Sequence, residues 1–228
     1  MLKHIFKIVL IISTFVLDTA QSWAHVPYFE HQDFSVQKPF TVEYSIEQSL
    51  AIYAWLEKND LGNSEDIDVF VFRIEEPTNV YLEVLVPECP GYEEFYPWFA
   101  LVGPGLSEPN GAIPFDIPPN YGIEIIQNEK SSESRDTFYE FFGGKSYYRG
   151  PHFYKNLNIP GTYYVYFWDP DQKGGDYVAV LGRKEIWRFR DICQAFRNTP
   201  LIRMDKELHI NCSESAVENW HELDTVNH

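Results

Sequence analysis

Three histidines in this sequence, His25, His31 and His152, are candidates for the nitrogen ligands that Cu(II) prefers. His25 directly follows residues 22–24 (Ser-Trp-Ala), a small-x-small pattern at which signal peptides are cut. Cleavage there would place an α-amino group and an imidazole on one residue, and the two together chelate a metal ion. His152 or His31 is a candidate second ligand. The alternative is that His25 is an ordinary exposed terminal residue, so an exported, redox-capable copper protein is one hypothesis.

Aspartates form two groups that have the oxygen ligands required by Ca²⁺. Asp66 and Asp68 stand at the start of an expected strand, and Asp169, Asp171 and Asp176 surround a glycine-containing turn. No EF-hand spacing is present, and Asp is also a common turn residue because its side chain bonds the backbone nearby. Calcium binding and ordinary turn chemistry are therefore both open at these positions.

An aromatic segment at 138–154 is interrupted by Gly143 and Gly144. Exposed aromatic rings mark recognition surfaces for sugars or proteins. The candidate binding residues are Tyr139, Phe142, Tyr147, Tyr148, Arg149 and Tyr154. The alternative is that these rings alternate into the core of a sheet, as aromatic residues commonly do.

The sequence lacks the familiar signatures of catalysis. It contains no GxSxG, HExxH, phosphate-binding loop or dinucleotide fingerprint. Three cysteines, Cys89, Cys193 and Cys212, leave at least one thiol unpaired in a monomer, and their spacing does not determine the pairing. These observations favour binding over catalysis.

Charge and hydropathy constrain location and partners. The formal charge of −16 argues against nucleic-acid partners, which require a basic surface. Lys3 and Lys7 precede the apolar stretch 8–17, so residues 1–24 are predicted to be a signal peptide. No other stretch is apolar enough to span a bilayer. We therefore expect a secreted, periplasmic or cell-surface protein with no membrane span after cleavage.

The elements that position these residues are expected to be strands. Strand patterns occur at 40–46, 48–57, 66–74, 80–86, 98–102 and 123–126. Residues 163–168 and 176–181 are apolar on both faces, and the segment 169–175 between them is rich in turn residues. We predict that these two strands form a central antiparallel hairpin.

After Gly182 the apolar spacing becomes closer to that of a helix over 184–196, and Asn198-Thr199-Pro200 is expected to end it. The predicted organisation is a signal peptide at 1–24, a β-sandwich at 25–183, and a helical extension with a polar tail at 184–228.

Three segments resemble pre-peptidase C-terminal domains, which are found in secreted bacterial proteins. They are EDIDVFVFRIEEPTNVYLEVLV, WFALVGPGL, and PGTYYVYFW followed by GGDYVAVLG. The resemblance covers 65–182 with a long insertion, and no peptidase domain precedes the module here. It implies a jelly-roll-like antiparallel β-sandwich and a role in binding calcium, collagen or polysaccharide.

We therefore expect an all-β protein with a short C-terminal helical extension. The predicted function is a secreted, non-catalytic module that binds an extracellular or cell-surface polymer or protein. The copper-binding protein built on His25 is the alternative, and Ca²⁺ or Cu²⁺ are the candidate cofactors.

Overall fold

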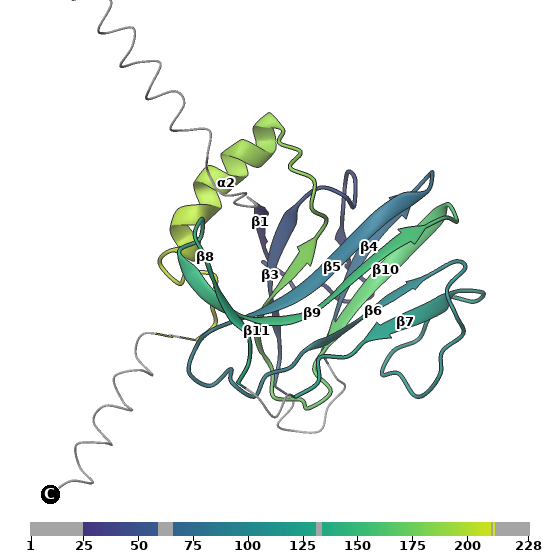
Figure 1. Cartoon of the computed structure of the whole chain (residues 1–228), viewed down its shortest axis with the longest axis horizontal. Helices are drawn as coiled ribbons and strands as arrows, with labels where there is room; N and C mark the ends of the chain where they lie inside the picture. Colours follow the sequence, from purple (N-terminus) through teal and green to yellow (C-terminus); the bar gives the residue numbers. More distant parts are fainter. Residues whose placement is uncertain (1–24, 59–65, 131–133, 211, 213–228) are drawn as a thin grey trace, which may run out of the picture.

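Two β-sheets form the body of the protein (Figure 1). The structure is a computed structural model, and it describes residues 25–58, 66–130, 134–210 and 212. One sheet has six strands in the order β1 (Val26–Phe29), β3 (Leu50–Leu56), β11 (Gly175–Leu181), β5 (Thr78–Pro87), β9 (Lys145–Leu157) and β8 (Thr137–Glu140). The other has five, in the order β2 (Phe40–Thr41), β4 (Ile67–Ile74), β10 (Gly161–Trp168), β6 (Trp98–Gly103) and β7 (Gly122–Ile126).

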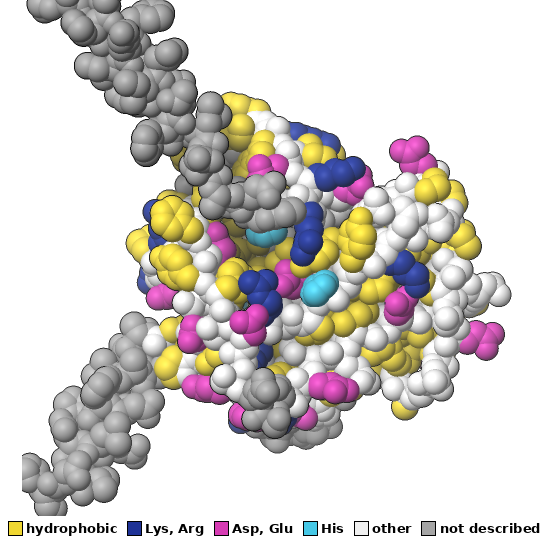
Figure 2. Space-filling view, in the orientation of Figure 1, with side chains coloured by type: hydrophobic (Ala, Val, Ile, Leu, Met, Phe, Trp, Pro, Cys, Tyr) yellow, Lys and Arg dark blue, Asp and Glu magenta, His cyan; other side chains and the backbone are white. Residues whose placement is uncertain are grey.

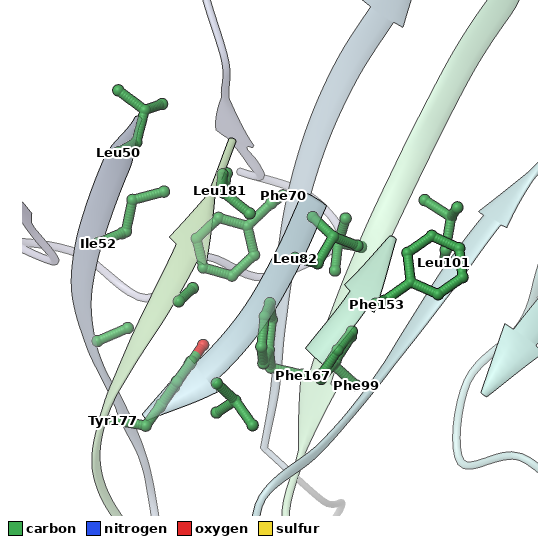
Figure 3. Packing of buried hydrophobic residues seen from close by; sticks show 14 of the residues in the cluster. Leu50, Ile52, Phe70, Leu82, Phe99, Leu101, Phe153, Phe167, Tyr177 and Leu181 are labelled. Atoms are coloured by element: carbon green, nitrogen blue, oxygen red, sulfur yellow. The ribbon is translucent and has the colours of Figure 1, made fainter. Parts of the chain in front are cut away.

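The main hydrophobic core lies between these two sheets (Figure 3). Every second residue of a strand points to the same face. Tyr177, Ala179 and Leu181 of β11 face the main core, while Val178 and Val180 face outward. Phe167 of β10 packs against Tyr177 with ring centroids 5.1 Å apart, which joins one sheet to the other. The predicted all-β sandwich is confirmed.

The predicted central hairpin is wrong. β10 pairs with β4 and β6, whereas β11 pairs with β3 and β5, so the two strands lie in different sheets. The turn at 169–175 crosses from one sheet to the other instead of closing a hairpin. Both strands are interior strands of their own sheets, and this explains why each is apolar on both faces. The apolar pattern indicates a central position but does not say whether two such strands share hydrogen bonds.

The outer face of the six-stranded sheet carries a second apolar cluster, to which helix α2 (Phe189–Ile202) contributes Ile202. Two details of the expected elements change. The helix continues through Pro200, which lies in its last turn, and the strand expected at 40–46 is reduced to Phe40 and Thr41. Pro200 has no N–H, so the last turn of the helix lacks the backbone hydrogen bond that this residue would otherwise donate. No helix in the part of the chain that the structure describes is long and apolar enough to cross a membrane.

The outer face of the five-stranded sheet is covered by the connection 104–121. Phe115 in this connection stacks on Tyr166 of β10 with ring centroids 4.1 Å apart. Ile113, Ile117 and Tyr121 pack on the same cluster. The apolar residues within this proline-rich connection are therefore structural.

A disulfide joins Cys89, just after β5, to Cys212 beyond α2. It links positions 123 residues apart in the sequence and ties the C-terminal segment to the sandwich. Cys193 is a free thiol on the exposed side of α2. Sequence reasoning had left the pairing open. The predicted signal peptide and most of the predicted tail lie outside the described residues.

Candidate functional site

A cleft of about 620 Å³ lies between the segment that follows β1, the end of β3 and the start of β4. Carboxylates, a tryptophan and two histidines dominate its walls. The lining residues are Glu30, His31, Gln32, Asp33, Ser35, Val36, Gln37, Trp55, Glu57, Asp66, Ile67 and His209. We call this the acidic cleft.

Glu30 is held at the base of the cleft by two backbone donors. Its Oε1 accepts a hydrogen bond from the Phe34 amide at 2.9 Å, and its Oε2 accepts one from the Trp55 amide at 2.8 Å. The Val69 amide of β4 donates to the Phe34 carbonyl at 2.6 Å. Residues 30–34 are thereby turned back over the first residues of β4, which brings Glu30 and Asp33 beside Asp68.

Asp68 is the most unusual residue of the site because it is a carboxylate with 0% exposure. Its Oδ2 accepts a hydrogen bond from the Tyr177 hydroxyl at 2.7 Å, but its Oδ1 has no hydrogen-bond partner within the described structure. One oxygen each from Glu30, Asp33 and Asp68 lie within 4.8 Å of one another. A buried carboxylate normally has its oxygens paired, so this arrangement calls for either a proton shared with a neighbouring carboxyl or a bound cation.

The electrostatics of the cluster reflect this crowding. Burial raises the pKa of Glu30 to about 7, and the negative charge of Asp33 adds to the effect. Burial also raises the pKa of Asp68 well above its usual range, with repulsion from Glu30 as the next cause. Without a cation, the cluster therefore retains a proton near neutral pH.

Asp66 and His209, which is bonded to the buried Asp176, complete the walls. The Glu57 amide donates to Asp66 Oδ2 at 2.6 Å, and burial raises the pKa of Asp66. His209 bonds Asp176 through Nδ1 at 2.7 Å, and its ring faces that of Trp55 with centroids 4.5 Å apart. Asp176 is thus committed to a protein partner, whereas Asp66 faces the cleft.

This donor set has the character of a Ca²⁺ site. Ca²⁺ takes six to eight oxygen ligands from carboxylates, carbonyls and water, in flexible geometry. Glu30, Asp33 and Asp68 would supply the protein ligands, with Asp66 beside them, and the open cleft admits water for the remaining positions. Asp66 and Asp68 were singled out from the sequence as calcium ligands, whereas Glu30 and Asp33 were missed.

The second aspartate group makes ordinary turn contacts. Asp169 Oδ2 accepts hydrogen bonds from the amides of Lys173 at 2.6 Å and Gly174 at 3.0 Å. Asp171 pairs with the ammonium of Lys130 at 3.0 Å. The structure therefore does not bring Asp169, Asp171 and Asp176 together around one point, and turn stabilisation explains the first two.

The histidines proposed as copper ligands occupy different surroundings. His25 Nδ1 lies 2.5 Å from the Ser49 hydroxyl, and burial lowers the pKa of its imidazole to about 4. His152 lies on β9 and stacks on Tyr81 with ring centroids 6.1 Å apart. No cluster of three ligand side chains in the described ranges includes either histidine or His31.

The aromatic segment divides between core and surface. Tyr147 is 2% exposed and its hydroxyl lies 3.4 Å from that of Tyr53 under α2. Tyr148 lies beneath the Arg135 guanidinium, 4.4 Å from ring to Cζ. Tyr139, by contrast, is 61% exposed on β8, next to the tip of the β8–β9 hairpin.

The other candidates from this segment face different directions. Arg149 pairs with Glu83 and Asp136, each at 3.3 Å. Tyr154 is exposed on β9, and Phe142 lines a groove beside α2. The six candidate binding residues therefore do not form one site.

Similarity to known proteins is found among solved structures. No family model matches the sequence, and no curated protein matches it. Among solved structures, the chain is similar to the pre-peptidase C-terminal domain of a collagenase from Bacillus anthracis. The two are 18% identical with a TM-score of 0.30, over 59% of this chain and 87% of that domain. It is the same family that the sequence motifs resemble, and the fold assignment itself rests on the sheet topology described above.

Proposed function

We propose that this protein is an exported, non-catalytic module that binds Ca²⁺ in the acidic cleft. The observation that carries the proposal is the buried Asp68 carboxylate: one of its oxygens lies within 4.8 Å of oxygens from Glu30 and Asp33, and its Oδ1 has no hydrogen-bond partner within the described residues. A divalent cation would satisfy that oxygen and neutralise three crowded carboxylates at once. Its ligands would come from residues 30–33 and from β4, so bound Ca²⁺ would fasten the N-terminal segment to the sandwich.

Two features support the exported location. The first is the signal-peptide pattern of residues 1–24. The second is the Cys89–Cys212 disulfide, since disulfides persist in oxidising compartments outside the cytosol. Extracellular Ca²⁺ is abundant, and extracellular modules bind it with dissociation constants of about 10⁻⁴ to 10⁻³ M.

The partner we propose is an extracellular or cell-surface component. Exposed aromatic residues at the β8–β9 hairpin tip and beside α2 support this role, because monomeric proteins seldom leave large apolar side chains grouped on one surface. The copper alternative has less support, since His25 bonds Ser49 and His152 stacks on Tyr81.

Chelation tests the calcium proposal directly. The melting temperature of the purified protein should fall when EGTA is added and recover with excess CaCl₂. MgCl₂ should restore little, because Mg²⁺ requires a strict octahedral site and gives up its water reluctantly. Equal melting curves in EGTA and CaCl₂ would contradict the proposal.

A further inference from the structure

Helix α2 buries Ala195 and Ile202 but presents three large apolar side chains to the outside. Phe189 is 83% exposed and Phe196 is 79% exposed, and the exposed Ile192 lies between them. The spacing of these three residues places them on one face of the helix. A surface helix of a globular protein normally buries such a stripe against the core.

The inward face of α2 is anchored by polar bonds instead. Asp191 is buried, and its Oδ2 accepts hydrogen bonds from Gln48 Nε2 at 2.9 Å and from the Arg188 amide at 3.0 Å. Asn198 is also buried and donates from Nδ2 to the Pro27 carbonyl of β1 at 3.0 Å. These bonds fix the rotation of the helix, so the outward direction of the apolar stripe is built into the fold.

The β8–β9 hairpin tip extends this apolar surface. Arg203 donates to the Phe142 carbonyl from Nε at 3.1 Å and from Nη2 at 2.9 Å, which holds the tip beside the end of α2. Phe141 at the tip is 77% exposed. Between tip and helix lies a groove of about 430 Å³ lined by Phe142, Trp187, Ile192, Ala195, Phe196, Thr199, Pro200 and Arg203. We call the surface formed by 141–142, Trp187 and the outer side of α2 the α2 face; Figure 2 shows apolar side chains along this side of the molecule.

The chain segment that carries this surface is rich in basic residues, in an otherwise acidic protein. Residues 183–206 contain seven Lys or Arg and three Asp or Glu, a net charge of +4 in the sequence, whereas the whole chain carries −16. The basic residues are Arg183, Lys184, Arg188, Arg190, Arg197, Arg203 and Lys206; Lys184 and Arg190 pair with Glu47 and Glu43, which neutralise these two charges locally. Apolar side chains flanked by arginines are the composition of helices that lie in the interface of an anionic membrane.

We infer that the α2 face docks on the surface of an anionic phospholipid bilayer. A second copy of the chain would bring two basic faces together, and a soluble polyanion would leave the phenylalanines in water. A bilayer interface accommodates both groups. The inference rests on the proposed export and names the cell-surface partner.

Vesicle flotation tests this inference on the full chain as isolated from an exporting host, with EGTA present to prevent bridging by Ca²⁺. Vesicles of phosphatidylglycerol and phosphatidylcholine should carry the wild type upward, and added salt should weaken the binding. The double variant Phe189→Ser with Phe196→Ser should bind at least about tenfold more weakly, because two exposed rings no longer enter the interface. Arg197→Glu should weaken binding to anionic vesicles. Tyr154→Ser, which removes an exposed ring elsewhere, is the matched control and should bind as the wild type does.

Three results would overturn the inference. They are a wild type that does not float, a double variant that floats equally well, and a wild-type dimer in sedimentation that the double variant dissociates. The last would mean that a second copy covers the α2 face. The melting shift with Ca²⁺, measured on the same preparations, reports on the acidic cleft separately. Failure of flotation with that shift intact would refute lipid docking and leave the proposed calcium function standing.

Discussion

Substituting Asp68 by Asn separates calcium binding from general stability. The Asn carbonyl oxygen can still accept the hydrogen bond from the Tyr177 hydroxyl. Its amide nitrogen would replace the unpartnered Oδ1 and could donate to Glu30. The variant therefore loses a charge and a calcium ligand while it keeps the shape of the side chain.

The expected magnitudes follow from the geometry. Two carboxylates within 4.8 Å repel each other by about 3.5 kcal/mol when both are ionised, at an effective dielectric constant of about 20. A retained proton relieves part of this, so Asp68→Asn should stabilise the calcium-free protein by about 2 kcal/mol at pH 8. For a chain of this size that is a rise in melting temperature of about 4–8 °C.

Calcium should raise the melting temperature of the wild type but not that of the variant. At a concentration of about one hundred times its dissociation constant, Ca²⁺ stabilises the wild type by about 2.7 kcal/mol, or about 5–10 °C. The variant should show almost no shift. Scanning calorimetry at pH 8 in EGTA and in CaCl₂ measures both effects. Asp171→Asn, at an exposed aspartate paired with Lys130, is the matched control and should keep the full calcium shift.

This pair of results is difficult to produce by misfolding, because the variant is more stable than the wild type without calcium and unresponsive with it. An Asp68→Asn protein with an unchanged calcium shift would refute the assignment of the site. A variant that is less stable than the wild type at pH 8 in EGTA would refute the electrostatic reasoning.

Three further predictions concern other parts of the structure. Without Ca²⁺, the melting temperature should fall as the pH is raised from 5 to 8, because the pKa of Glu30 in the folded protein, about 7, lies above its ordinary value of 4.5. The stabilisation from the protonated Glu30 is complete below pH 4.5 and is lost as the pH rises through 7. A melting temperature that rises steadily over this range would disagree. Tyr147→Ala should lower the free energy of unfolding in urea by about 3 kcal/mol, whereas Tyr139→Ala should change it by less than about 0.5 kcal/mol. Equal effects would contradict the assignment of Tyr147 to the core and Tyr139 to the surface. Replacing Cys89 and Cys212 by Ser should cost about 2–5 kcal/mol, and an unchanged urea midpoint would show that the disulfide does not stabilise the sandwich.

Sequence patterns predicted the sandwich because strand alternation is a local property. The residues of β11 show this, since Tyr177 and Ala179 lie on one face of the strand and Val178 on the other. Strand pairing is not local. β10 and β11 are joined by a turn with hairpin chemistry, yet each pairs only with distant strands. Nothing in the turn residues distinguishes a sheet-crossing connection from a hairpin.

The candidate site was predictable in part for the same reason. Asp66 and Asp68 were found because two carboxylates at the start of an apolar strand are unusual. Glu30 and Asp33 lie more than thirty residues earlier, and their approach depends on the Val69–Phe34 backbone bond, which no sequence pattern announces. The outward face of α2 was missed because periodicity shows that a helix has an apolar stripe, but not which way the stripe points.

Calorimetric titration of the EGTA-treated, desalted protein with CaCl₂ tests the central claim most directly. The account predicts one saturable site. It also predicts that binding releases protons at pH 7, which buffers of different ionisation enthalpy would reveal, because the carboxylates must ionise to bind the metal. Absence of saturable binding, or the same binding by Asp68→Asn, would contradict the account.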